Sequence, residues 1–195
     1  MTKLINIAKR LTNTSVEGPG IRYALWMQGC NVGCRDCCNQ NMLPFEPRQI
    51  VSTDIICDEI VRASIEYQIE GITLLGGEPT LQAEGLSEIA EFCSKLNLSV
   101  FLFTGLKLDR LRSLQRAGVD VLLAYCDVVV DGPFLPAKPE KSRNWVGSIN
   151  QQFHYLTSFY DSSIETNREY SPSIEIRVGT DTSCSVIGSP FLVNR

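Results

Sequence analysis

Short apolar runs alternate along the chain with stretches in which apolar residues recur at helical spacing. The apolar runs predict buried strands at residues 4–7, 21–27, 72–75, 98–103 and 126–130. The helical spacing predicts helices around residues 56–67, 86–96 and 108–114. This alternation favours parallel strands joined by right-handed crossovers. We therefore expect an α/β fold in one domain over residues 1–195, and the small number of units favours an open partial (β/α) barrel.

The later part of the chain is harder to interpret. Gly118 is predicted to stop the third helix, and residues 119–125 fit a helix or a strand equally well. Residues 135–172 are polar, are interrupted by prolines and show no clear period. Beyond them, apolar and polar residues alternate on both sides of a turn, which predicts a C-terminal β-hairpin over about residues 173–190 with one face buried.

Composition narrows the class of protein. Hydrophobic residues make up 44% of the chain and charged residues 21%, as in ordinary globular proteins. The net charge of −4 argues against a nucleic-acid partner, and no apolar run approaches the length of a membrane span. The chain holds eight cysteines without an export signal, so we expect a reducing, cytoplasmic location.

Four of the cysteines lie in a loop over residues 29–39, directly after the predicted strand 21–27. Cys30, Cys34 and Cys37 have the spacing C-x3-C-x2-C, which places three thiolates where they can wrap one iron–sulfur cube. A cluster used for electron transfer is normally closed by four cysteines, so three ligands leave one iron free for chemistry. The loop also follows the carboxyl end of a strand, where parallel sheets place active sites.

Other uses of these cysteines remain open. With Cys38 added, the four thiolates could hold a structural zinc ion. Adjacent cysteines are poor simultaneous ligands for one ion, however, and a second C-x2-C pair is missing from the sequence. A disulfide knot is disfavoured by the expected reducing location.

The cysteine spacing resembles the signature of the radical S-adenosylmethionine (SAM) enzymes. That resemblance implies a [4Fe–4S] cluster whose open iron is chelated by the amino and carboxylate groups of SAM, and a 5′-deoxyadenosyl radical as the reactive species. A second motif, Gly76-Gly77-Glu78-Pro79, ends the predicted strand 72–75. Alone, this tetrapeptide is typical of a tight turn. Beside the cysteine loop it favours ligand binding, because two glycines let the backbone approach a ligand closely.

Further segments resemble the glycyl-radical-enzyme activases. Residues 17–22 (EGPGIR) are similar to the D-G-P-G-x-R motif of that group, and residues 127–134, 147–151 and 174–190 resemble segments of the anaerobic ribonucleotide reductase activating proteins. The resemblance implies three cluster ligands, Cys30, Cys34 and Cys37, and a set of SAM contacts: Asp36, Cys37, Cys38, Gly76, Gly77 and Glu78. The chain departs from the usual pattern at several positions: Glu17, Asp36, Cys38, Val146 and Ser189.

The remaining candidates have mostly structural interpretations. Asp131 ends the strand 126–130 and is a candidate SAM contact from its place at a carboxyl end, whereas Asp127 is assigned a structural role. His154, the only histidine, is expected on the surface. The other four cysteines are expected to pack in helices or strands, with exposure left open for the last of them: Cys57, Cys93, Cys126 and Cys184.

The resulting hypothesis is an activase that uses SAM and one [4Fe–4S] cluster to make a glycyl radical on a partner, with anaerobic ribonucleotide reductase as the favoured partner. An electron donor such as flavodoxin or ferredoxin is implied. Two alternatives stay open: a radical SAM enzyme acting on a peptide or small metabolite, and a non-catalytic metal-binding module.

Overall fold

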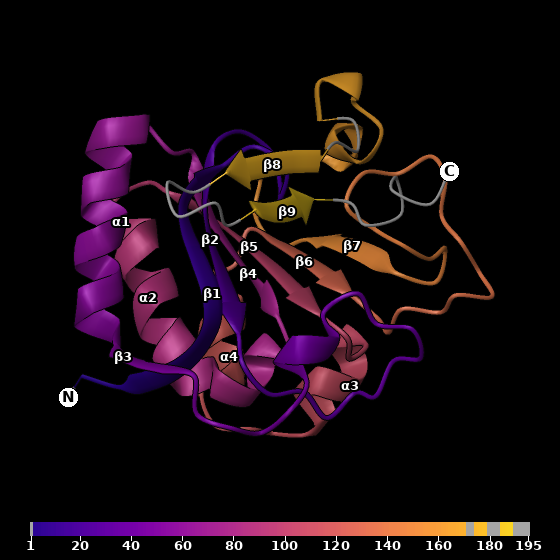
Figure 1. Cartoon of the computed structure of the whole chain (residues 1–195), viewed down its shortest axis with the longest axis horizontal. Coiled ribbons are helices and arrows are strands. Elements are labelled where there is room, and N and C mark those ends of the chain that lie inside the picture. The colour runs from indigo at the N-terminus through magenta and orange to yellow at the C-terminus, as the bar shows by residue number, and fades with distance from the viewer. Residues whose placement is uncertain (1, 171–173, 179–183, 189–195) are drawn as a thin grey trace.

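Seven strands form one mixed sheet in the order β3-β1-β2-β4-β5-β6-β7 (Figure 1). A computed structural model gives this fold and describes residues 2–170, 174–178 and 184–188. The strands are β1 (Leu4–Thr14), β2 (Arg22–Met27), β3 (Gln49–Ser52), β4 (Gly71–Gly76), β5 (Ser99–Thr104), β6 (Val128–Asp131) and β7 (Gln152–Tyr155). Four of them, β2, β4, β5 and β6, run parallel, and β1, β3 and β7 pair antiparallel with their neighbours. The mostly parallel α/β sheet expected from the sequence is confirmed.

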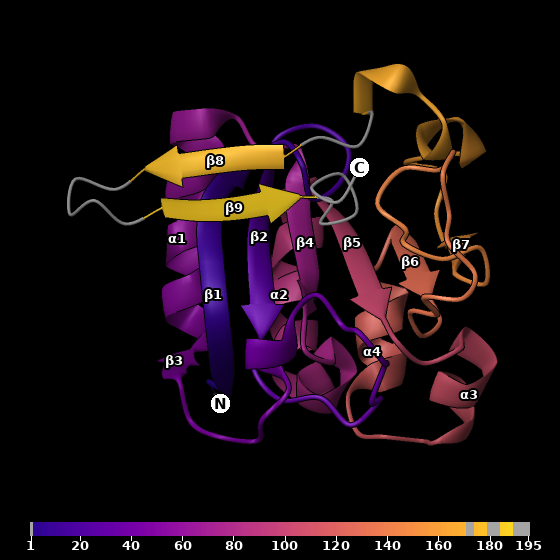
Figure 2. The ribbon, with the colours of Figure 1, turned by 45° about the vertical axis from the view of Figure 1, so that its right-hand side comes forward.

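The helices pack mainly on one face of this sheet (Figures 1 and 2). They are α1 (Thr53–Tyr67), α2 (Ala83–Lys95), α3 (Leu108–Ser113) and α4 (Val119–Ala124), with 3-10 turns η1 (Gln40–Met42), η2 (Pro79–Gln82), η3 (Ser162–Glu165) and η4 (Arg168–Tyr170). Ser52 caps α1 by accepting a hydrogen bond from the Ile55 amide at 3.4 Å. The described helices include none that is long and apolar enough to cross a membrane.

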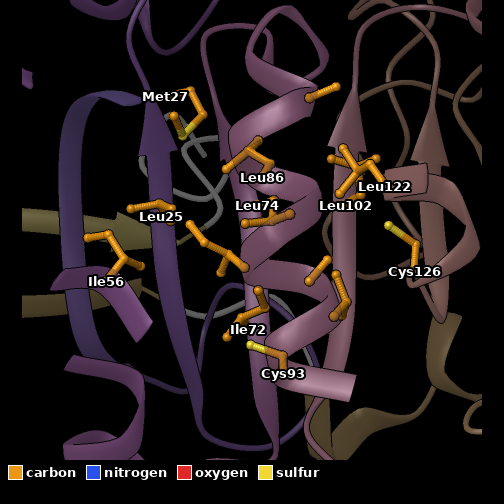
Figure 3. Close-up of a cluster of buried hydrophobic side chains, with 14 of the residues drawn as sticks. Leu25, Met27, Ile56, Ile72, Leu74, Leu86, Cys93, Leu102, Leu122 and Cys126 are labelled. Carbon is orange, nitrogen blue, oxygen red and sulfur yellow. The ribbon is translucent and has the colours of Figure 1, made fainter. Parts of the chain in front are cut away.

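The main core lies between the helices and the sheet, and strand alternation sends every second side chain into it. Leu25 and Met27 of β2 point to the helices, whereas Ala24 and Trp26 point to the opposite face. Figure 3 shows how the side chains on the helix side meet; the labelled ones are Leu25, Met27, Ile56, Ile72, Leu74, Leu86, Cys93, Leu102, Leu122 and Cys126. Each large apolar side chain buried here stabilises the fold by about 1.5–3 kcal/mol.

Two predictions about the elements were wrong. The first strand was expected to end at residue 7, but β1 continues to Thr14 because its polar residues still pair with β2 on one side and, over Leu4–Ile7, with β3 on the other. The third predicted helix ends at Ser113, and Gly118 instead begins α4 with a φ of 79°. A Cβ at Gly118 would lie 2.5 Å from the Glu84 backbone nitrogen, so glycine here allows close approach to α2.

The C-terminal hairpin is confirmed, as a separate sheet made of β8 (Ile174–Val178) and β9 (Cys184–Gly188), with the face assignment corrected. Alternation implied that its apolar face is buried. Instead Ile176 and Val178 are 59% and 75% exposed, and the face that packs inward carries Glu175 and Arg177 of β8 with the buried Ile187 of β9. Glu175 accepts from the Thr14 hydroxyl at 2.7 Å, and Arg177 donates to the Asn13 carbonyl, so hydrogen bonds to the end of β1 orient the hairpin.

The late segment before the hairpin joins the amino end of the parallel strands through Arg22. This arginine is fully buried, and its guanidinium donates to Thr73, Ser99 and Tyr160 and to carbonyls of Pro19, Ile72 and Ser99. Tyr160 also donates to Glu70. A buried charge is stable only when hydrogen-bond partners surround it, and Tyr160 is one of these partners. Tyr160 therefore covers the end of the sheet that lies opposite to the cysteine loop.

Candidate functional site

A cavity of about 340 Å³ lies on the face of the sheet that the helices leave open. Four parallel strands supply its floor through Trp26, Leu75, Phe103 and Val130. The loop after β2 closes one side, the hairpin a second, and the segment from Phe134 to Tyr170 a third. The volume is within the range of small-molecule sites.

The cysteine loop is fixed at both ends by backbone hydrogen bonds. The Gly29 amide donates to the Met42 carbonyl at 2.8 Å, and the Cys30 amide donates to the Leu43 carbonyl at 3.0 Å. From the turn directly after β4, the Gly77 amide donates to the Met27 carbonyl at 2.8 Å and the Glu78 amide donates to the Gly29 carbonyl at 2.9 Å. The two predicted motifs, the cysteine loop and the double-glycine turn, are therefore in direct contact.

The double glycine is needed for this contact. A Cβ on Gly77 would lie 2.3 Å from the Gly29 carbonyl oxygen, and one on Gly76 would lie 2.4 Å from the Met27 nitrogen. Gly76 also has a φ of 111°, which disfavours other residues. Both glycines line the cavity. The missing side chain of Gly76 makes room for the backbone of β2 and that of Gly77 for the cysteine loop, whereas the sequence had suggested room for a ligand.

The sulfur atoms on the loop meet backbone amides. Val32 donates to Cys30 Sγ and Asn39 to Cys37 Sγ, each at 3.4 Å. The pKa of the Cys37 thiol is lowered to about 6 by a hydrogen bond from Cys38, whereas burial raises the pKa of Cys30 and of Cys34. Thiolates that accept amide hydrogen bonds are the donor set of iron–sulfur clusters, so these residues fit such a group.

The three sulfurs do not converge on one point. Among residues 2–170, 174–178 and 184–188, no three His, Cys, Asp or Glu side chains are gathered closely enough to hold a single metal ion. A cluster of several irons would bind each thiolate at a different iron, so Cys30, Cys34 and Cys37 would not need to meet at one ion to hold it. Cys37 and Cys38 face the cavity, and Cys30 and Cys34 lie half-buried on the same loop.

Glu78 is buried and acts as an anchor. Its Oε1 accepts from the Thr80 amide at 3.1 Å and from the Thr104 hydroxyl at 2.9 Å, and its Oε2 accepts from the Gly105 amide at 2.9 Å. Its carboxylate therefore joins the ends of β4 and β5. It is not among the residues that line the cavity.

Asp131 lies at the end of β6, also outside the cavity lining. It accepts from the Leu108 amide at 2.7 Å and from Lys107 Nζ at 2.9 Å, and His154 Nε2 lies 2.9 Å away. Burial raises its pKa, but these donors outweigh burial and hold the pKa below its usual value. His154, expected on the surface, is half-buried in this contact, because β7 pairs with β6 and brings it there.

The other sequence predictions have mixed outcomes. The Asp36 side chain is 66% exposed, and its Oδ2 lies 3.6 Å from Arg35 Nε. The backbone of Asp36 has a φ of 57°. Asp127 is structural, since it accepts from the Val100 amide at 2.8 Å. Three cysteines pack in or against the core as expected, namely Cys57, Cys93 and Cys126, whereas Cys184 is exposed.

Several cavity residues were missed as site candidates. Glu17 accepts from the Gly188 amide at 3.0 Å, and burial raises its pKa to about 7. Lys9 Nζ lies over the Trp26 ring, 5.4 Å from the ring centroid. Trp145 has a φ of 60°, which is unusual for a bulky residue and marks a constrained position in the wall. Glu17 belongs to a motif quoted from the sequence, which was a usable signal. Trp145 offered none.

Comparison with known proteins agrees with the loop chemistry. Residues 16–154 match the family model described as "4Fe-4S single cluster domain". The anaerobic ribonucleoside-triphosphate reductase-activating protein of Haemophilus influenzae is 31% identical over 71% of this chain and 90% of its own length. The proteins of the same name in Escherichia coli K12 and phage T4 are 31% and 30% identical, over 72% and 70% of this chain and 92% and 85% of their own lengths. The chain belongs to the family of anaerobic ribonucleoside-triphosphate reductase-activating proteins.

Proposed function

We propose that this protein is a radical SAM activase that makes a glycyl radical on an anaerobic ribonucleotide reductase. The observation that carries the proposal is the contact between the three-cysteine loop and the double-glycine turn at the mouth of the cavity. When bound, a [4Fe–4S] cluster and SAM supply one-electron chemistry that removes a hydrogen atom from a glycine Cα of the partner. The relatives' names support the choice of partner.

In this proposal each part of the site has a separate task. Cys30, Cys34 and Cys37 hold the cluster, and the backbone amides that meet Cys30 and Cys37 stabilise their thiolates. Gly76, Gly77 and the cavity-facing Cys38 border the space for SAM. Glu78 and Asp131 position the loops after β4, β5 and β6 through their hydrogen bonds.

The fold suits a large substrate. Helices cover one face of the sheet, and the other face is bounded by the hairpin and the late segment, which fits an open partial (β/α) barrel of the radical SAM type. A partner loop can enter such a cavity from the side and exclude water from it. The cysteine loop is exposed at Arg35 and Asp36, with 89% and 66% of their side chains accessible. A reductant of the flavodoxin or ferredoxin type can therefore approach the cluster from outside.

The test is anaerobic reconstitution followed by mixing with SAM, a strong reductant and the anaerobic ribonucleotide reductase of the same organism. We expect a doublet radical signal in electron paramagnetic resonance on the reductase, and oxygen-dependent cleavage of that chain at a glycine. Cys34→Ala should abolish both, and Cys57→Ala, a half-buried cysteine packed against the core, should not. Turnover of a peptide or small metabolite, with no radical on the reductase, would favour the alternative substrate class.

A further inference from the structure

The free edge of β9 faces the cavity. Val186 and Ile187 point to opposite faces of the hairpin, since they are 55% and 5% exposed, yet both line the cavity together with Gly188. Two neighbours on opposite faces can border one cavity when the edge of their strand faces it. Figures 1 and 2 both place β9 on the side of β8 toward the middle of the main sheet. The cavity is therefore bordered by a strand edge.

That edge is unpaired in the part of the chain the structure describes, where the hairpin sheet consists of β8 and β9. The Gly188 amide donates to Glu17 Oε1 at 3.0 Å, so it points away from β8. In an antiparallel ladder the main-chain groups of alternate residues point to the same side. The N–H and C=O of Val186 consequently point away from β8 as well, toward the cavity. An unpaired edge of this kind is a template for another strand.

We propose that an extended, glycine-containing segment of the partner protein pairs with the β9 edge as a third strand, which guides its glycine into the cavity. This inference rests on the proposed function. A glycine offers no side chain for recognition, so a site that selects it must bind the neighbouring main chain, which strand addition does. The Glu17 carboxylate already accepts one backbone amide at this edge.

The hairpin has the polarity expected of such a platform. Its outward face carries exposed apolar side chains, namely Ile174, Ile176, Val178 and Val186. A strand added to β9 would extend this face, and alternate apolar residues of the partner would pack beside Val186. Thr14 and Asn13 tie the hairpin to the body through side chains of β8, whereas Glu17 takes the Gly188 amide at the end of the β9 edge.

The test uses two proline substitutions in register. Val186→Pro removes the amide that faces the cavity, and an edge position whose N–H points outward tolerates proline. Ile176 lies directly opposite Val186 in the ladder, so Ile176→Pro makes the same change on the far edge of β8. With the reconstituted protein and the anaerobic reductase, we expect Val186→Pro to weaken binding about tenfold or more, and Ile176→Pro to change it less than about threefold.

Amide hydrogen exchange gives a second readout that needs no variant. In the complex, exchange in residues 184–188 should slow, while exchange in residues 174–178 should change little. Equal losses for the two proline variants, unchanged binding in Val186→Pro, or no added protection in β9 would each overturn the edge pairing. If the unaltered protein neither binds nor activates the reductase, the proposed function falls and this inference falls with it.

Discussion

The two faces of the main sheet are built from the same strands but are closed in different ways. On one face, helices α1, α2, α3 and α4 complete a continuous apolar core. On the other face the described residues form two smaller apolar clusters, and the cavity that both of them line is closed by loops and by a hairpin held through polar contacts and the buried Ile187. Apolar packing on the helix face should therefore contribute most of the free energy of unfolding, whereas the other face holds the cavity. Neighbouring residues on one strand should consequently respond differently to the same substitution.

Cysteines on the two sides should separate iron binding from folding most sharply. Cys34→Ala removes a thiolate from the exposed loop, so iron should fall from about four atoms per chain to almost none, with little change in the unfolding of the cluster-free chain. Cys93→Ala, on the buried face of α2 in the main core, should retain iron but lower the free energy of unfolding by about 1–2 kcal/mol. Iron analysis and urea denaturation measure both. Full iron content in Cys34→Ala would contradict the assignment.

Leu74 and Leu75 form a matched pair on β4. Leu74 is fully buried under the helices, and Leu75 is 8% exposed and lines the cavity. Leu74→Ala should lower the free energy of unfolding by about 3 kcal/mol. Leu75→Ala should cost about 1 kcal/mol, because part of that side chain has no packed neighbour to lose, and should instead weaken SAM binding. Equal losses of stability in urea denaturation would show that the two faces contribute alike.

Glu17 should give the open face a pH dependence between about pH 4.5 and 7. Its folded pKa of about 7 lies above the usual 4.5, because burial disfavours the charged form. The native state therefore keeps a proton on Glu17 that the unfolded chain releases. The contribution of Glu17 to the free energy of unfolding is fully present below pH 4.5 and is lost as the pH rises to about 7. The loss is about 2 kcal/mol, since Glu17 is partly accessible through the cavity. Glu17→Gln should flatten this slope in the cluster-free chain, whereas Glu84→Gln, on an exposed side chain, should not.

The parallel strands and the cysteine loop could be predicted because each carries its signal locally. Continuous apolar runs marked β2, β4, β5 and β6, and the C-x3-C-x2-C spacing marked the loop. The contact between this loop and the double-glycine turn followed from both motifs lying at carboxyl ends of neighbouring strands.

The features that were missed depend on distant partners. The hairpin has the alternation of an ordinary half-buried ribbon, and only the hydrogen bonds of Glu175 and Arg177 to the end of β1 show that its polar face is inside. The contact of His154 with Asp131 requires β7 to pair with β6, and β7 lies in a stretch without a readable period. Trp145 reaches the cavity through a backbone conformation that its residue type disfavours.

Arg22 sets the order in which the chain can mature during its synthesis. Arg22 leaves the ribosome early, but two of its side-chain partners, Ser99 and Tyr160, are synthesised much later. Until these partners are present, the guanidinium has a lower free energy in water than in the interior. The amino end of β2 should therefore stay exposed to water. The nascent sheet should therefore remain incomplete at that end until the segment around Tyr160 has been translated.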